Sequence, residues 1–222
     1  MENDYLQENV GYTFLTTPEA ESIFADVDFA LRSGKHIQKC RLQNMQFDFV
    51  RNYYDQLKLY YNKLFDFCLS REGENDLEYY FIDFFKDGNG HYHRGNIPPE
   101  NREYLAESHL IIAFLMIRMY ILEPRAESRI PIQDFKAQVL LEYEEYKPHL
   151  LRLFAKSEDT EETDYELKSI EDEMDKALKK FNDLCWILID KSTETFEIMP
   201  SFNRLLNMFE NYIITTPIND ER

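Results

Sequence analysis

Histidine and cysteine side chains are the groups in this chain that could hold a metal ion or act as nucleophiles. His91 and His93 form the only close pair of histidines. Residues two apart on a strand share one face, so both imidazoles could ligate one ion. No cysteine and no third histidine lies near them in the sequence to complete a ligand shell. We therefore expect no metal site, although a small metal protein built on these two histidines stays open as an alternative.

Other catalytic chemistry leaves no signature in the sequence. Cys40, Cys68 and Cys185 lie far apart, and this odd, sparse set predicts reduced thiols in a cytosolic protein. There is no glycine-rich phosphate loop, and the GxGxxG, HExxH and GxSxG motifs do not occur. Carboxylates are so numerous that no single pair can be assigned as acid and base. We expect a protein with no catalytic residue and no cofactor.

A basic segment between residues 32 and 41 stands out in an acidic chain. The 222 residues include 42 Asp and Glu against 25 Lys and Arg, and the formal net charge of −17 opposes free binding to a DNA backbone. The segment itself contains no acidic residue, so it is the best candidate in the chain for contact with DNA phosphates. A solvated loop that balances acidic neighbours is the alternative. The candidate residues are Arg32, Lys35, His36, Lys39 and Arg41.

A second set of basic candidates lies nearer the C-terminus. The spacing predicts a helix over 164–181 whose start is acidic, which opposes its insertion into a DNA groove. Lys179 and Lys180 lie at the other end of this helix, and Lys191 follows in the next turn. We expect these three lysines either to contact phosphates or to be dispersed surface charges.

The elements that must position these residues are mostly helices. Thr17 and Pro18 predict the start of a first helix, and Gly34 predicts its end. A single long helix is expected from about 44 to 64, with Tyr53 and Tyr60 beside its apolar stripe. Exposed aromatic side chains favour a partner or dimer interface, and packing within the core is an equally open interpretation.

Two hairpins separate the predicted helices. Short apolar runs predict strands at 65–69 with 77–85, and again at 184–189 with 195–199. Further helices are expected at 105–123, 132–146, 148–155 and 164–181, and after Pro200. The fold class expected is mainly α with small β-hairpins (α+β). A helix packed before a two-stranded wing, twice over, predicts tandem winged-helix domains over residues 1–97 and 98–222.

Three short motifs resemble a known family in their order and spacing. They are Ile23-Phe24, Arg32-Ser33-Gly34-Lys35-His36-Ile37, and Leu184-Cys185-Trp186-Ile187-Leu188 followed by Phe196-Glu197-Ile198-Met199-Pro200-Ser201. Together they resemble the MukE/MksE-like subunits of bacterial condensins, over about residues 18–214.

The resemblance implies a role for the chain. Members of this family are tandem winged-helix ("kite") proteins that form homodimers and bind a kleisin subunit, which closes a ring with an SMC-like ATPase. They are not enzymes, and they serve chromosome organisation and segregation or plasmid defence. The resemblance implies DNA contact mainly within the complex, at Gly34-Lys35-His36 first, and a cytoplasmic, nucleoid-associated protein.

Other observations bear on location and on the main alternative. The longest apolar run, at 110–122, is interrupted by Arg118 and too short to span a bilayer, so no membrane contact is expected. The alternative to a condensin subunit is a stand-alone winged-helix regulator of transcription. A regulator would favour a basic recognition helix, and the helix expected at 164–181 begins with acidic residues.

Overall fold

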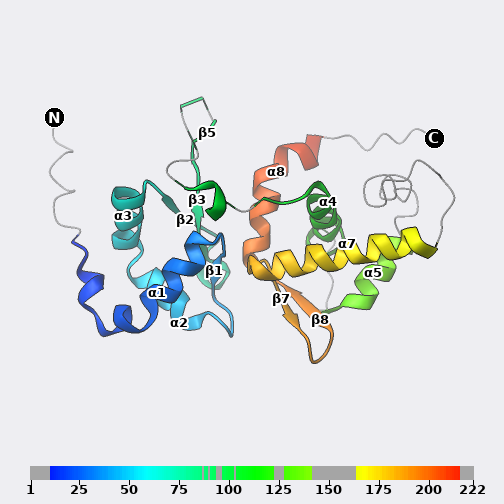
Figure 1. Cartoon of the computed structure of the whole chain (residues 1–222), viewed down its shortest axis with the longest axis horizontal. Helices are drawn as coiled ribbons and strands as arrows, with labels where there is room; N and C mark the ends of the chain where they lie inside the picture. The colour runs from blue at the N-terminus through cyan, green and yellow to red at the C-terminus, as the bar shows by residue number, and fades with distance from the viewer. Residues whose placement is uncertain are drawn as a thin grey trace. The chain divides into compact units, whose positions relative to one another are not determined.

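The chain divides into two units, Met1–Glu103 and Tyr104–Arg222, each with its own hydrophobic core. The sequence places the boundary after residue 97, and the independence of the two halves as domains stays a prediction. The computed structural model describes residues 11–86, 88–89, 91–93, 97–102, 104–122, 128–141 and 164–215. Figure 1 shows the elements in both units.

The first α-helix of the described residues has the two ends that the sequence predicts. A short 3-10 turn, η1 (Thr13–Thr16), precedes α1 (Pro18–Arg32). The side chain of Thr17 accepts a hydrogen bond from the backbone N–H of Ala20, which satisfies one of the free donors at the helix start. After α1, Gly34 has φ 81°, a value that favours glycine. Both predicted ends of this helix are confirmed.

The long helix expected at 44–64 is two helices. The structure has α2 (Asn44–Asn52) and α3 (Tyr54–Phe65), separated at Tyr53, which has φ −112° and ψ 20°. The prediction of one continuous helix is therefore wrong. The break contains neither glycine nor proline. Tyr53 takes part in the hydrogen bonds of both helices, since its N–H donates to the carbonyl of Phe49 and its carbonyl accepts from the N–H of Leu57. The spacing of apolar residues does not indicate this break, because both helices bury apolar side chains in the same core.

A small antiparallel sheet completes the core of the first unit. It contains β1 (Ile37–Gln38), β2 (Cys68–Glu72) and β3 (Tyr79–Asp83) in the order β1-β3-β2. The predicted hairpin is confirmed as β2 and β3, joined by a loop that includes η2 (Asn75–Leu77). Its first strand lies later than the expected 65–69, because α3 continues to Phe65. A second pair, β4 (Phe85–Lys86) and β5 (Tyr92–His93), follows, and then η3 (Pro99–Asn101).

The second unit is built around one apolar helix. The helix α4 (Glu107–Met116) continues as a π-helical segment, η4 (Ile117–Leu122), and its buried residues include Ile112, Ala113 and Met116. The chain then forms β6 (Ile130–Pro131), α5 (Ile132–Leu141) and α7 (Asp164–Asp183). The helix expected at 148–155 lies outside the described residues, as does the end of the one expected at 132–146.

The second sheet repeats the strand order of the first. Strands β7 (Ile187–Asp190) and β8 (Thr195–Ile198) form the expected hairpin, and the order is β6-β8-β7. The first strand starts later than expected because Cys185, with φ 61°, lies in a turn. A 3-10 turn, η6 (Pro200–Phe202), leads into α8 (Asn203–Thr215). The chain is thus a mixture of helices and small antiparallel sheets, which confirms the α+β class.

None of the helices in the described part of the chain is long and apolar enough to cross a membrane.

Candidate interaction site

Arg32 is held within the first unit. Its guanidinium pairs with Asp28 at 2.6 Å, one turn earlier on α1, and its Cζ lies 5.4 Å from the centre of the Phe65 ring at the end of α3. Asp28 also accepts a hydrogen bond of 3.2 Å from the hydroxyl of Tyr61 on α3. Arg32 therefore joins α1 to α3, and its side chain is 31% exposed.

The middle of the basic segment is split between the core and the surface. The side chain of His36 is buried, with its ring stacked on Phe81 at 5.1 Å between centroids. Lys35, one residue earlier, is exposed. The burial follows from strand β1, which starts at Ile37 and is hydrogen-bonded to β3. Of these two neighbours, Lys35 is the one with a side chain that a phosphate can reach.

The end of the basic segment lies beside the β2–β3 loop. Lys39 Nζ pairs with Asp76 Oδ1 at 2.7 Å, and this contact lowers the pKa of the Asp76 carboxyl through the hydrogen bond and the charge of Lys39. Arg41 is exposed in the turn that leads to α2. Lys39 and Arg41 therefore both lie at the surface. Asp76, 37 residues after Lys39, reduces the positive charge there.

Tyr53 and Tyr60 lie at the edge of the aromatic core of the first unit. Both are half-buried, and the Tyr60 ring packs edge-on against Phe24 and Phe14, with centroids 5.4 and 5.8 Å away. Tyr53 packs against Phe49 at 5.1 Å. The two tyrosines therefore contribute to the core, and only part of each ring is open to a partner.

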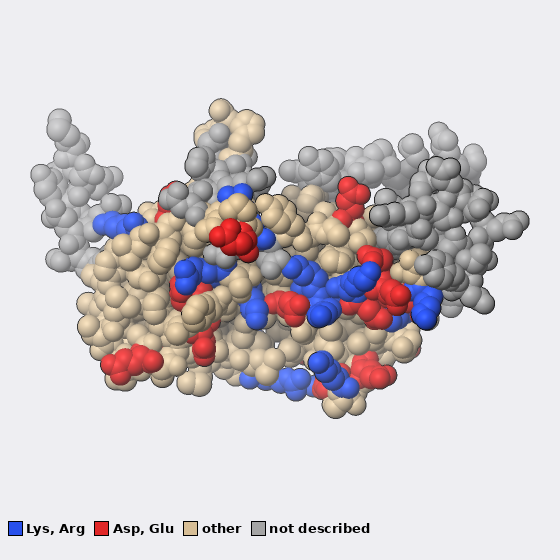
Figure 2. All heavy atoms as spheres, in the orientation of Figure 1, with Lys and Arg blue, Asp and Glu red and all other residues tan. Residues whose placement is uncertain are grey.

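The basic residues of the second unit are mixed with acids. Figure 2 shows Lys and Arg side chains interleaved with Asp and Glu side chains along α7. Lys179 is exposed and Lys180 is half-buried, while Lys191 is exposed in the turn between β7 and β8. On the same helix Lys176 pairs with Glu173, and this hydrogen bond lowers the pKa of the Glu173 carboxyl. The face of α7 offers single cations rather than a uniform basic surface.

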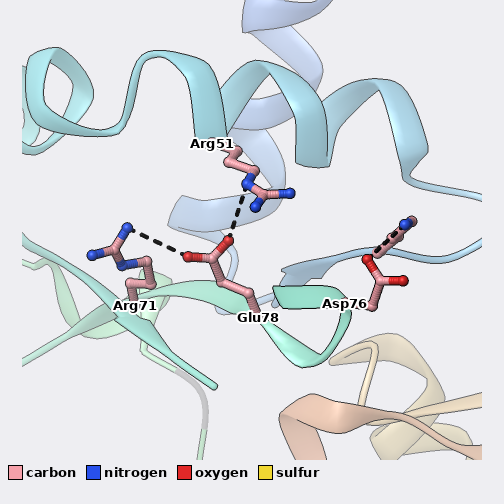
Figure 3. A network of polar contacts seen from close by, with 5 residues as sticks. Arg51, Arg71, Asp76 and Glu78 are labelled. Carbon is pink, nitrogen blue, oxygen red and sulfur yellow. Dashed lines mark hydrogen bonds and ion pairs between the residues drawn. The ribbon is translucent and has the colours of Figure 1, made fainter. Parts of the chain in front are cut away.

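A set of charged residues that the sequence analysis missed meets on the first unit. Glu78 lies just before β3 and is almost fully buried. Its carboxylate contacts Arg51 Nε of α2 at 3.5 Å and Arg71 Nη1 of β2 at 3.4 Å, as Figure 3 shows. Both arginine side chains are about half exposed, at 50% and 51%. We call this arrangement the Glu78 cluster.

Aromatic rings lie against the two arginines of the Glu78 cluster and against the neighbouring Lys58. The Arg71 guanidinium lies 4.9 Å from the centre of the Tyr54 ring, and Lys58 Nζ of α3 lies 5.9 Å from the same ring. The Arg51 guanidinium lies 5.9 Å from the Phe47 ring. Burial raises the pKa of the Tyr54 hydroxyl, which donates a hydrogen bond to the carbonyl of Leu69. Arg51 and Lys58 lie on two different helices, and no pattern in the sequence pointed to Arg71 or Glu78.

The histidines form no metal centre in the described part of the chain. No group of three or more potential ligands comes together among those residues. His91 is exposed, and His93 lies in β5. His109 lies on α4 against Phe181, and its Nδ1 is buried without a hydrogen-bond partner among the described residues. His109 therefore lies against the core with one ring nitrogen left unsatisfied among the described residues.

Comparison with known proteins gives the family. The family model described as condensin complex protein MksE matches residues 22–210. A comparison with curated proteins found no match. The family match covers most of the 222 residues and confirms the resemblance seen in the short motifs of the sequence. The chain therefore belongs to the MksE family of condensin complex proteins.

Proposed function

We propose that the chain is a non-catalytic accessory subunit of a bacterial condensin-like complex. In this proposal it forms a homodimer, binds a kleisin subunit and regulates an SMC-like ATPase, in chromosome organisation and segregation or in plasmid defence. The observation that carries the proposal is the family match over residues 22–210. A cytoplasmic, nucleoid-associated location is part of the same proposal.

The topology of the two units supports a tandem winged-helix architecture for this subunit. In the first unit the order α1, β1, α2, α3, β2, β3 is the order of a winged-helix domain, in which the last two strands form the wing. The first strand pairs with the last in both sheets, giving β1-β3-β2 and β6-β8-β7. We therefore propose that each unit is a winged-helix domain.

The distribution of charge supports protein partners as the main ligands. The net charge of −17 repels nucleic acid on average, and acids pair with Arg32 and Lys39 of the basic segment. We propose that DNA contact takes place mainly within the assembled complex. Besides Arg32 and Lys39, the residues proposed for it are Lys35, His36, Arg41, Lys179, Lys180 and Lys191, of which His36 is buried in the free chain.

The test is a pull-down of the tagged chain from extract of its native cells, with the bound proteins identified by mass spectrometry. We expect a kleisin-like protein and a large SMC-like ATPase, both absent when the tag alone is used. Light scattering of the purified chain should give twice the mass of 26.8 kDa. Recovery of neither protein, with specific retention of one DNA fragment by the chain alone, would replace the proposal with a stand-alone DNA-binding regulator.

A further inference from the structure

We propose that Arg51, Lys58 and Arg71 form a surface that binds the phosphate groups of duplex DNA, with Glu78 as the residue that orients the two arginines. This inference rests on the proposed function, since DNA reaches the chain there as part of a condensin complex. It adds a binding site outside the basic segment at 32–41.

Three separate elements bring the cations together. Arg51 comes from α2, Lys58 from α3 and Arg71 from β2. Arg71 is the central one, because it shares Glu78 with Arg51 and the Tyr54 ring with Lys58. The three cations are therefore linked through one carboxylate and one aromatic ring. Several linked cations can neutralise neighbouring phosphates of a nucleic-acid strand.

The two arginines are held in place before any ligand arrives. Each guanidinium is fixed by the carboxylate of Glu78 and by an aromatic ring, that of Phe47 for Arg51 and that of Tyr54 for Arg71. A guanidinium has five N–H donors, and the contact with Glu78 leaves each side chain about half exposed, at 50% and 51%. A fixed and exposed guanidinium loses little entropy when it binds an oxyanion.

The surroundings favour phosphate over an acidic peptide. Protein interfaces use apolar and aromatic side chains as anchors. In the Glu78 cluster the rings of Tyr54 and Phe47 already lie against cations, and Phe47 is buried. The cluster itself therefore offers charge and hydrogen-bond donors, and the exposed apolar side chain beside it is that of Leu77.

The local charge has the required sign in spite of the acidic chain. Three cations, Arg51, Lys58 and Arg71, face the acids Glu78 and Asp55. A third acid, Asp76, also interacts with Arg51, but its carboxylate is paired with Lys39. Glu78 is almost fully buried, so the net charge at the surface that a ligand meets is more positive than a count of these residues alone gives. Asp55 lies in the first turn of α3, directly after Tyr54, and its negative charge opposes phosphate binding.

The test compares two variants on one helix, using the full-length protein. Lys58→Gln removes a cation of the proposed surface, and Lys63→Gln removes an exposed lysine five residues further along α3, on a different face of the helix. Binding to a fluorescent DNA duplex is measured by anisotropy over a series of salt concentrations. We expect Lys58→Gln to weaken binding about 5- to 10-fold at low salt and to reduce the salt slope by about 0.9, with little change for Lys63→Gln.

A second pair of variants tests the arginines without exposing Glu78. Arg51→Lys and Arg71→Lys keep a positive charge against the carboxylate but lack the planar fork. We expect each to weaken DNA binding about 2- to 5-fold while the free energy of unfolding changes by less than the error of the measurement.

Several outcomes would overturn this inference. Equal effects of Lys58→Gln and Lys63→Gln would show that only the overall charge matters. Equally tight binding of polyglutamate, with the same sensitivity to Lys58→Gln, would make the surface a site for acidic peptides. Absence of duplex binding by the unaltered chain at low salt would also overturn it. The pull-down reports on the proposed function separately, because recovery of the partners does not depend on these variants.

Discussion

The charge of Glu78 lies where little water reaches it. Its side chain is 9% exposed, whereas the side chains of Arg51 and Arg71 are about half exposed. The ion pairs of 3.5 and 3.4 Å are long, so each contributes less than a tight buried pair would. Without the carboxylate, the two guanidiniums would repel each other across the same space. The stabilising effect of Glu78 thus comes from both contacts together.

We expect Glu78→Gln to lower the free energy of unfolding by about 1 to 2 kcal/mol, through loss of both ion pairs and repulsion between the arginines. Glu74→Gln is the matched control, because it removes the same charge from an exposed position in the same loop. The control should change stability by less than about 0.5 kcal/mol. Urea denaturation of both variants checks the difference, and equal losses would contradict it.

His109 carries the clearest effect of burial on a titrating group in the second unit. Burial lowers the pKa of its imidazole, the carboxylate of Glu173 opposes this, and Lys176 and Lys180 add to it. The neighbouring Ser108 donates a hydrogen bond of 3.1 Å to Glu173, so the carboxylate already has partners in Ser108 and Lys176. A proton on His109 is therefore less favoured in the folded chain than in the unfolded one.

This pKa shift predicts a stability that falls in mild acid. The folded state binds the proton of His109 more weakly than the unfolded state does. The contribution of His109 to the free energy of unfolding is therefore largest above about pH 6.5 and declines as the pH drops below it. We expect His109→Gln to lose less thermal stability than the unaltered chain between about pH 7.5 and 5.5. His91→Gln, at an exposed histidine, should keep the original pH dependence. Identical profiles for all three proteins would rule out His109 as the cause.

The sequence shows which residues of the first unit are charged, but it does not predict which of them form ion pairs. Lys39 pairs with an acid 37 residues away, and Arg51 and Arg71 meet on Glu78 only because β2, β3 and α2 pack together. The same holds for His36, which lies in a polar stretch and is buried by the pairing of β1 with β3. These contacts are set by tertiary structure, which spacing along the chain does not encode.

At the scale of elements, the loop between β2 and β3 depends on one glycine. Gly73 has φ 76°, and a Cβ at this position would lie 2.2 Å from the carbonyl oxygen of Leu77. The backbone N–H of Leu77 bonds to the carbonyl of Glu74, so the loop closes tightly on itself. The loop carries Asp76 and leads to Glu78, and its shape therefore sets the position of both acids.

We expect Gly73→Ala to lower the free energy of unfolding by about 2 kcal/mol or more, from the strained φ and the clash with the backbone of Leu77. Gly88→Ala is the matched control, since a Cβ at Gly88 would meet nothing within 4 Å. Denaturation in urea should separate the two variants clearly. A loss of the same size at Gly88 would contradict this explanation, because a stiffer unfolded chain alone should make Gly88→Ala neutral or slightly stabilising.

Local signals predict the ends of elements better than their continuity. Thr17 and Gly34 mark the limits of α1 because a cap and a left-handed residue act through neighbouring backbone atoms. The break at Tyr53 has no such signal, because the aromatic residues on both sides keep the helical spacing. The short strand β1 has no local signal either, because two residues are too few to show an alternation of apolar and polar side chains.

At the scale of the whole molecule, the two cores predict two separate responses to mutation. The core of the first unit includes Phe47, Val50 and Leu57, and that of the second unit includes Phe181 and Phe196. No residue belongs to both clusters of buried side chains. Each unit should therefore lose its hydrogen-bonded structure without the other when its own core or loop is damaged.

Hydrogen exchange read by mass spectrometry checks this with one variant in each unit. Gly73→Ala should speed exchange in residues 11–102 and leave 164–215 unchanged, because its strain lies in the β2–β3 loop. Phe181→Leu shortens a fully buried side chain of the second core and should do the reverse. Faster exchange in both regions with either variant would show that the chain unfolds as one cooperative body. In that case the Glu78 cluster would be sensitive to changes in the second core, and the duplex-binding comparison on α3 would need Phe181→Leu as a further control.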